Sequence, residues 1–327
     1  MIQDYSINKA VNKTGQIKLD VKDNKILYEL EKNARQPISQ LAKKVGLSKE
    51  TVGYRIKRLE KEKVIVGYST VINPAVLGMN LYRLFFKFQN TTPKKEEEII
   101  HYLARIPSIS RLCSVEGAWD LTASIMTKDV FEFKQIYDEF SSHYGKYIGQ
   151  KNIVIVTKIY HFLHNLLFDI NDRSCLIYLQ KEKNVNLDEI DEKIIKMLKK
   201  NCRLPTMEIA KKLGLSANAV KNRIKRLLKE RAIVCFKIKV QDFPYGYQHF
   251  HILLTLQSID KEKKDALIKS LIEDSHVYFI IESVGADLEF ECHAKNISEL
   301  HKFLKDLRNK FPCIRDHQTT VFCKSYF

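Results

Sequence analysis

The sequence lacks the paired cysteines from which a disulfide framework or a zinc ribbon would be built. Its 327 residues include seven cysteines, and none of them forms a C-x-x-C pair. This odd and scattered set fits a reducing compartment, so we expect a cytoplasmic protein. The first twenty residues contain no apolar core of signal-peptide length, and no run of 18 apolar residues occurs. We therefore expect no membrane-spanning segment.

Sequence motifs of several enzyme classes are also missing. There is no glycine-rich phosphate loop, no nucleophile elbow and no H-E-x-x-H pattern. Histidines occur in pairs, at His161 and His164 and at His249 and His251, and His293 follows a cysteine. A metal site needs three or four converging ligands, whereas these pairs lie on separate predicted strands or strand ends. The sequence thus predicts no catalytic residues, no metal and no cofactor.

What the sequence does contain is a long internal repeat. Segments 19–65 and 187–233 align without a gap at a shift of 168 residues, and 25 of the 47 aligned positions are identical. A period of this length indicates two copies of a whole domain pair rather than a solenoid of short repeats.

Positive charge is concentrated in these two segments. The net charge is +16 at pH 7; segment 19–65 holds 12 Lys and Arg against 7 Asp and Glu, and segment 187–233 holds 13 against 6. A basic field of this kind attracts polyanions, first nucleic acid and second an anionic membrane surface. Composition alone leaves open the plainer interpretation of a solvated, lysine-rich surface.

Each copy of the repeat carries the signals of three short helices. In the first copy Asp20 is a good N-cap, Gly46 ends a helix over 38–45, and Ser48 caps a third helix over 49–61. The second copy has the same signals at the equivalent positions. In the third helix, apolar residues recur at helical spacing, so its basic residues are left on the other faces.

A β-branched and aromatic run follows the third helix. Residues 64–72, with Gly67 as a turn, predict a small hairpin, which would complete a winged helix-turn-helix. The sequence therefore predicts winged helix-turn-helix domains at 19–74 and 187–242.

A longer mixed segment follows each helical unit. Alternating periodicities predict the order β-α-β-β-α-β, the ferredoxin-like arrangement, over 80–165 and again over 247–327. Residues 1–18 are predicted to be a flexible basic arm, and 166–186 a linker in which 175–179 could form an extra strand. The predicted fold class is α+β, with two winged helix-turn-helix domains alternating with two ferredoxin-like domains.

Both copies carry a specific pattern: L-D-x-x-D, then N-x-R, then L-A-x-x-V-G-L-S or a close variant, then V-x-x-R-I-x-R-L. This pattern resembles the leucine-responsive and asparagine-synthesis regulator family, Lrp/AsnC. The positions that carry the resemblance are Asp20, Asp23, Asn33, Arg35, Ala42, Gly46, Leu47, Ser48, Arg55, Arg58 and Leu59, and again Asp188, Asp191, Asn201, Arg203, Ala210, Gly214, Leu215, Ser216, Arg223, Arg226 and Leu227. The resemblance covers nearly the whole chain, as two family-sized units fused in one polypeptide.

The resemblance implies a transcriptional regulator that binds double-stranded DNA and dimerises through its α+β domains. Each predicted sheet needs a partner face, and the linker is long enough for the two to meet in one chain, so we expect an intramolecular pseudo-dimer. Family members often assemble further, so a higher homo-oligomer is a second expectation.

Some family members bind an amino acid near the turn after the second strand of the α+β domain. That turn has a G-x-x-D pattern, which the first copy matches at Gly117 and Asp120. Trp119 lies within it and could cover a ligand or pack at an interface. The second copy is one residue shorter, with Gly285 and Asp287. We therefore expect any amino-acid effector to bind beside Gly117, Trp119 and Asp120 rather than at the second turn; the alternative is a tight connection without a ligand.

The third helix of each unit is the candidate DNA reader, because the N-terminal residues of a recognition helix contact base edges while its cations meet phosphates. The candidate DNA-binding residues are Lys49, Thr51, Tyr54, Arg55, Lys57 and Arg58 in the first copy, and Asn218, Lys221, Asn222, Arg223, Lys225 and Arg226 in the second. One arginine of each pair could instead form a structural salt bridge. The leading positions of the two helices differ, so two unlike half-sites are expected.

Two alternatives to a regulator remain open. Siroheme decarboxylases are similar in fold, and such an enzyme would carry His and Arg residues in its α+β cavity; His249, His251 and His293 are present in that part of this chain. The basic third helices and the regulator-like turn argue against an enzyme. The second alternative is an adaptor that pairs with other family members and binds no DNA itself.

Overall fold

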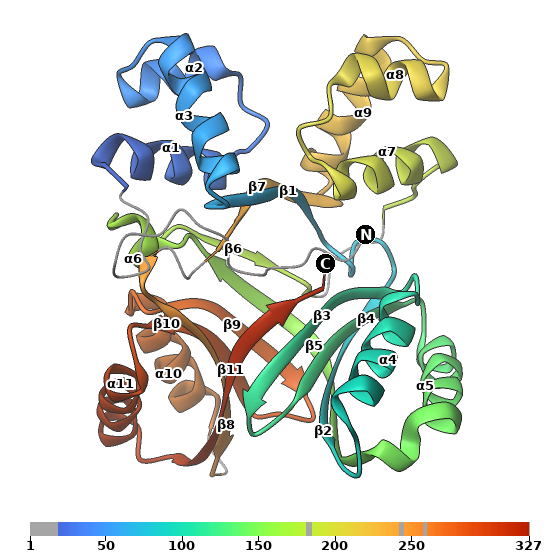
Figure 1. Cartoon of the computed structure of the whole chain (residues 1–327), viewed down its shortest axis with the longest axis vertical. Helices are drawn as coiled ribbons and strands as arrows, with labels where there is room; N and C mark the ends of the chain where they lie inside the picture. The colour runs from blue at the N-terminus through green and yellow to red at the C-terminus, as the bar shows by residue number, and fades with distance from the viewer. Residues whose placement is uncertain (1–18, 181–184, 242–244, 258–259, 327) are drawn as a thin grey trace.

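A computed structural model describes residues 19–180, 185–241, 245–257 and 260–326. The predicted arm at 1–18 lies outside the described residues. Figure 1 shows two helical units side by side on top of a β-barrel, with further helices packed on the outside of the barrel. None of the helices in the described ranges combines the length and the apolar character needed to cross a lipid bilayer.

The helical units form as their capping signals predict. The first unit contains α1 (Val21–Lys32), α2 (Ile38–Val45) and α3 (Lys49–Lys61), and the second contains α7 (Glu189–Lys200), α8 (Thr206–Leu213) and α9 (Ala217–Lys229). Asp20 forms a capping box with Asp23, and Asp188 forms the same box with Asp191. Gly46 ends α2 with a φ of 70°, in the left-handed region where a glycine is least strained.

The predicted hairpin at 64–72 is wrong. Residues Ile65–Ile72 form one continuous strand, β1, with no turn at Gly67, and β1 pairs antiparallel with β7 (Ile233–Val240) of the second copy. Each copy thus supplies one strand of a two-stranded ribbon. The β-branched pattern indicated strand structure correctly, but a local pattern cannot show whether a strand's partner lies nearby or 168 residues away.

The ribbon joins the two helical units into one body. The Ala34 amide donates to the Phe236 carbonyl at 2.8 Å, and the Thr70 hydroxyl donates to the Leu198 carbonyl at 2.7 Å. Arg35 donates to the Leu204 carbonyl at 2.9 Å. A single cluster of buried apolar side chains contains residues of both units. Because one core serves both units, their third helices are held at a fixed separation.

Two α+β domains follow the predicted strand and helix order. The first contains β2 (Asn80–Phe88), α4 (Pro93–Ala104), β3 (Ile109–Gly117), β4 (Leu121–Thr127), α5 (Val130–Tyr144), the 3-10 turn η1 (Gly145–Tyr147) and β5 (Ile148–Phe162). The second contains β8 (Gln248–Leu256), α10 (Lys261–Glu273), β9 (Val277–Val284), β10 (Leu288–Ala294), α11 (Ile297–Lys310) and β11 (Ile314–Ser325).

The strands of both domains form one closed sheet. Within the described residues the strand order is β2-β4-β3-β11-β8-β10-β9-β5-β6, and β2 also pairs with β5, so eight strands close on themselves. The two seams between the copies are β3 with β11 and β5 with β9. The expected intramolecular pseudo-dimer is therefore present, as a barrel with backbone hydrogen bonds across both seams rather than as two sheets packed face to face.

Successive side chains along each strand of the barrel point alternately outward, toward the covering helices, and inward, toward the barrel interior. Tyr82, Leu84 and Phe86 of β2 lie under α4 and α5, while Arg83 and Phe85 face the barrel interior. The predicted linker is not featureless where it is described. It contains α6 (Asn165–Phe168), whose Leu167 and Phe168 are buried against the helical units, and β6 (Cys175–Tyr178), which pairs with β5.

Candidate nucleic-acid interface

The third helices α3 and α9 begin in the same way. The Ser48 hydroxyl accepts from the Thr51 amide at 3.1 Å, and the Ser216 hydroxyl accepts from the Ala219 amide at 3.1 Å. The predicted buried stripe is confirmed in both helices: Val52, Ile56 and Leu59, and Val220, Ile224 and Leu227. Burial of this stripe fixes which residues of each helix face outward.

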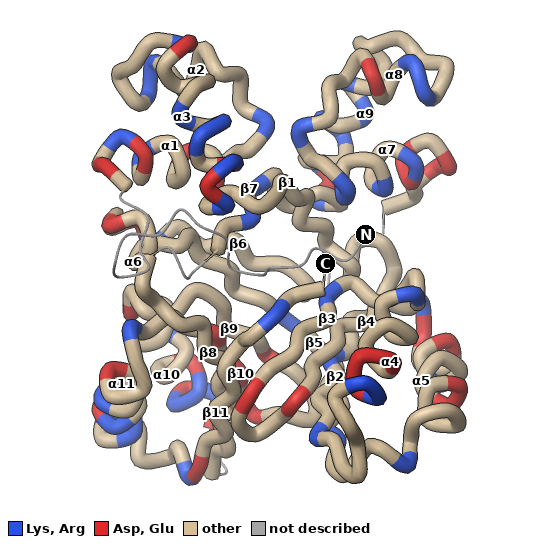
Figure 2. The backbone as a smooth tube through the Cα atoms, in the orientation of Figure 1, with Lys and Arg blue, Asp and Glu red and all other residues tan. Residues whose placement is uncertain are grey.

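The outward faces are basic and solvent-exposed. In α3, Lys49 and Lys57 are exposed, Tyr54 is 68% exposed, and Thr51 is half-buried beside the Ser48 hydroxyl. Figure 2 shows Lys and Arg along both helical units. The exposed lysines on α2, α3, α8 and α9 are Lys43, Lys44, Lys49, Lys57, Lys61, Lys211, Lys212, Lys221, Lys225 and Lys229. Asn218 and Asn222 are exposed among those of α9.

The four arginines predicted to bind DNA form internal ion pairs. Arg55 Nη1 lies 2.7 Å from Asp20 and 2.8 Å from Asp23, and Arg58 also pairs with Asp23. Asp23 is only 1% exposed, so it depends on these cations for its charge compensation. Both arginines thus hold α3 against the start of α1. The sequence alone suggests such a salt bridge for one arginine of each pair.

The second unit repeats the clamp. Arg223 Nη1 lies 2.7 Å from Asp188 and 2.9 Å from the fully buried Asp191, and Arg226 pairs with Asp191 as well. Hydrogen bonds from the Asp191 amide and from Arg223 lower the pKa of Asp188. The L-D-x-x-D and R-x-x-R parts of the repeat are therefore two halves of one internal ion cluster. The predicted DNA-binding lysines and asparagines of both helices, and Tyr54, are exposed.

One of the positions at which the two third helices differ in charge lies in the middle of the helix. Gly53 occupies the place in α3 that Lys221 occupies in α9, and a Cβ at Gly53 would meet no atom within 4 Å. We expect Gly53→Ala to stabilise the protein by about 0.5–1 kcal/mol, because alanine restricts the unfolded chain and favours helix. Gly53→Lys should also steepen the salt dependence of duplex binding by about 0.9 logarithmic units per decade.

Thermal unfolding and salt titrations of the two Gly53 variants check this expectation. Alanine serves as the matched control, since it gives the helix its backbone benefit without the cation. A lysine variant whose salt slope equals that of the alanine variant would place this face of α3 away from DNA.

The turn predicted to hold an effector is occupied by the protein itself. Trp119 is 6% exposed and packs on Phe85 with ring centroids 5.9 Å apart, in a cluster that includes Leu253 of the second copy. Asp120 accepts from Lys87 Nζ at 2.6 Å and from the Phe88 amide at 2.8 Å. Trp119 thus has the packing role, and both carboxylate oxygens of Asp120 already have donors.

Gly117 allows the two copies to approach each other closely. Its φ is 111°, and a Cβ there would lie 2.6 Å from the Thr319 carbonyl oxygen of β11. Gly285 is equivalent, with a φ of 100° and the Ile153 oxygen of β5 at 2.9 Å from the ideal Cβ. Each glycine lets one copy's turn lie against a strand of the other copy.

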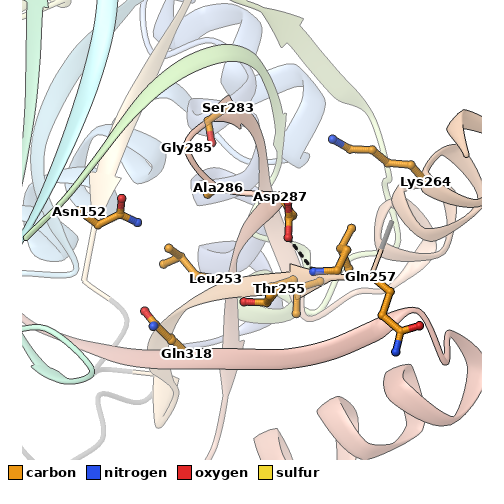
Figure 3. A pocket seen from close by; sticks show the side chains of 12 residues that line it. Asn152, Leu253, Thr255, Gln257, Lys264, Ser283, Gly285, Ala286, Asp287 and Gln318 are labelled. Carbon is orange, nitrogen blue, oxygen red and sulfur yellow. Dashed lines mark hydrogen bonds between the residues drawn. The ribbon is translucent and has the colours of Figure 1, made fainter. Parts of the chain in front are cut away.

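The second turn is one residue shorter than the first, yet its acid makes the equivalent backbone hydrogen bond. Asp287 accepts from the Leu256 amide at 2.7 Å, as Asp120 accepts from Phe88, and residues 88 and 256 are 168 apart. A cavity of about 700 Å³ lies beside this second turn (Figure 3). The residues that line it are Asn152, Leu253, Leu254, Thr255, Leu256, Gln257, Lys264, Ser283, Gly285, Ala286, Asp287 and Gln318.

This cavity was not predicted from the sequence, although one signal pointed to it. Lys264 on α10 lines the cavity, and the equivalent residue of the first copy is Glu96 on α4. The two copies thus differ in charge at the helix that borders the turn. The cavity also takes Asn152 from the first copy, a contribution that only the closed barrel brings into place. No group of three metal-ligating side chains occurs among the described residues.

Comparison with known proteins places this chain among DNA-binding transcriptional regulators. The AsnC-type helix-turn-helix domain model matches residues 19–60 and 187–228. The proline dehydrogenase transcriptional activator of Rhodobacter capsulatus is 32% identical over 122 residues, which are 37% of this chain and 79% of that protein. The HTH-type transcriptional regulator FL11 of Pyrococcus furiosus is 31% identical over 142 residues, 43% of this chain and 91% of that protein. The chain belongs to the Lrp/AsnC family.

A similar fold extends over nearly the whole chain of one solved structure. The siroheme decarboxylase NirDL is 12% identical, with a TM-score of 0.64, and the match covers 93% of this chain and 92% of that one. At this identity the likeness concerns the fold.

Proposed function

We propose that the protein binds double-stranded DNA sequence-specifically and recognises two unlike half-sites with α3 and α9. The observation that carries this proposal is the pair of basic third helices, fixed to each other by one shared core and different at their leading positions. A symmetric homodimer requires a palindromic site, whereas a pseudo-dimer within one chain does not.

The difference between the leading residues supports unlike readout. The first turn of α3 offers Lys49, Glu50 and Thr51, and the first turn of α9 offers Asn218 between two alanines. Asparagine can bond adenine through two hydrogen bonds, while lysine favours the guanine acceptors. The two helices therefore present different donors and acceptors to the major groove.

Selection from a pool of random duplexes tests this function. We expect enrichment of a site with two unlike half-sites at fixed spacing. Asn218→Ala should relax one half-site, and Lys49→Ala should relax the other. Enrichment of a perfect palindrome would contradict unlike readout, and a pool without enrichment would contradict sequence-specific binding.

We further propose that a small effector of the amino-acid class, where one acts, binds in the cavity beside Gly285 and Asp287. Lys264, which also lies 3.9 Å from Glu282, supplies a cation for a carboxylate, and Asn152 and Gln318 supply amide groups on the opposite side of the cavity (Figure 3). The first turn lacks such an arrangement, because Trp119 and Asp120 are engaged in packing and internal hydrogen bonds.

Removal of the cavity cation should abolish an effector response. We expect an amino acid that raises the melting temperature of the native chain to lose this effect in Lys264→Ala and to keep it in the matched control Glu96→Ala. A thermal-shift screen of the amino acids measures both variants. A response that disappears with Glu96→Ala but survives Lys264→Ala would move the site to the first copy.

A siroheme decarboxylase-like enzyme is the second candidate, favoured by the histidines His249, His251 and His293 in the second domain and by two arginines that face the barrel interior. We propose that the protein is not an enzyme. Arg83 and Arg111 form ion pairs with Glu289 and Glu291, so these arginines are not available to bind the carboxylates of a substrate. Addition of siroheme to the purified protein decides between the candidates. Spectral shifts with released CO₂ would favour the enzyme.

A further inference from the structure

The barrel interior contains a buried ion cluster whose charges are divided between the copies. Arg83 of β2 lies 2.7 Å from Glu289 and 3.3 Å from Glu291, both on β10. Arg111 of β3 lies 2.9 Å from Glu291. Both glutamates are fully buried, and the Arg83 side chain is 6% exposed. The first copy supplies the cations, and the second copy supplies the carboxylates.

Each glutamate also accepts hydrogen bonds within the second copy. Glu289 accepts from the Ser283 hydroxyl at 3.0 Å and lies 3.0 Å from His251 Nε2. Glu291 accepts from the Tyr278 hydroxyl at 2.9 Å. Burial alone would raise the pKa of both glutamates, but the arginine charges, together with hydrogen bonds from His251 and Ser283 to Glu289 and from His249 to Glu291, lower it. The cluster is charged in the folded protein and needs members from both copies.

The internal repeat shows what each copy would bring to a pair with itself. The equivalent of Arg83 is His251, and the equivalent of Arg111 is Phe279. Strands β4 and β10 are both seven residues long and begin at Leu121 and Leu288, so Glu289 and Glu291 correspond to Thr122 and Ser124. The first copy thus has no interior carboxylate at these places, and the second copy has neither arginine.

The three conceivable pairings differ sharply in buried charge. Two first domains would enclose four arginines opposite threonine and serine, and two second domains would enclose four glutamates. Only the mixed pair encloses two cations with two anions. Unpaired buried charges and juxtaposed like charges each cost several kcal/mol, whereas a paired cluster is tolerated.

We propose that Arg83, Arg111, Glu289 and Glu291 form a pairing code that makes the first α+β domain accept the second domain and reject a copy of itself. This code keeps α3 and α9 together in every assembled barrel, so each barrel carries both kinds of recognition helix. Between the helical units, Arg35 stacks on Phe236 and Arg203 stacks on the equivalent Tyr68, so these contacts do not discriminate. The buried Glu31 of the first copy lies 3.1 Å from Lys237 of the second copy and adds a smaller preference for the mixed pair. The inference concerns domain pairing and holds whether or not the protein binds DNA.

The cluster serves selectivity more than stability. Replacement of a buried ion cluster by apolar residues of similar volume is often neutral or stabilising. The full chain with Arg83→Met, Arg111→Met, Glu289→Met and Glu291→Met should therefore still fold, with a melting temperature no lower than that of the native chain, while its domains lose most of their preference for the mixed pair.

The test uses the full chain with a protease site inserted between Gln180 and Val185. After cleavage, the two halves are unfolded together, refolded and weighed by native mass spectrometry. Without a code, mixed pairs would outnumber each kind of homopair by two to one. For the native residues we expect mixed pairs to exceed homopairs by about 100-fold or more, since several kcal/mol oppose each homopair.

Two further variants each change the charges of one copy only, so they show which kind of homopair each charge prevents. Glu289→Thr with Glu291→Ser gives the second copy the residues of the first, so homopairs of the second half should appear while homopairs of the first half stay absent. Arg83→Met with Arg111→Met should allow homopairs of the first half alone. In the four-methionine variant, homopairs of both halves should appear beside the mixed pairs. Native halves that pair at random, or a four-methionine variant that forms mixed pairs only, would overturn the pairing code.

Discussion

Replacement of Arg55 and Arg58 together by alanine should destabilise the helical units by about 3–5 kcal/mol, the cost of leaving a buried charge without its partners. The physical reason is Asp23, which is 1% exposed and holds both arginines. Because both helical units share one core, loss of the arginine–Asp23 ion pairs should lower the stability of both units together. Arg223→Ala with Arg226→Ala should have an effect of similar size through Asp191.

Urea unfolding followed by far-ultraviolet circular dichroism measures this loss. The matched control is Lys57→Ala, which removes a neighbouring exposed cation of α3 and should leave the unfolding midpoint unchanged. Double arginine variants that keep native stability and lose only DNA binding would show that these side chains serve the nucleic acid rather than the fold.

DNA affinity should fall by about 10² to 10⁴ between 50 and 200 mM salt. This range follows if roughly four to eight phosphates are neutralised, because each contact contributes a slope of about −0.9. The exposed lysines on α2, α3, α8 and α9 supply enough cations for this number. Fluorescence anisotropy of a labelled duplex across a salt titration measures the slope, and a flat titration or an absence of binding at low salt would contradict the prediction.

Variants of the lysines locate the contacts behind that slope. Lys57→Ala with Lys225→Ala should reduce its magnitude by about 1.8, one phosphate for each helix. The control Lys134→Ala removes an exposed cation of α5, on the outside of the barrel and far from the helical units in Figure 1. An equal reduction by the control would indicate a general effect of net charge rather than contacts of the third helices.

The fold of each unit could be predicted to a large extent from the sequence. The helices at 38–45 and 49–61 have the predicted bounds, because caps such as Gly46 and Ser48 act over a few residues and can be recognised locally. The strand and helix order of both α+β domains was predicted for the same reason, since alternation and helical periodicity are properties of short segments. The repeat then implied that two such units would pair.

Contacts with residues far along the chain could not be predicted from the sequence. The basic character of Arg55 and Arg58 was evident, but their carboxylate partners on α1 became known only when α1 and α3 were packed together. Gly117 and Trp119 had the composition of a ligand turn, yet they lie against β11 and the interior of the barrel. A residue type shows which interactions are available to it, and the tertiary neighbours decide which interaction is made.

The sequence by itself determined the two-unit organisation, the capped helices and the basic third helices, because each depends on residues a few positions apart. Only the tertiary structure decided that β1 pairs with β7, that the cavity lies at the second turn, and that Arg83 faces Glu289 across the barrel. These features join residues that are more than a hundred positions apart. Local patterns do not encode such contacts, which form when strands from both copies close one barrel.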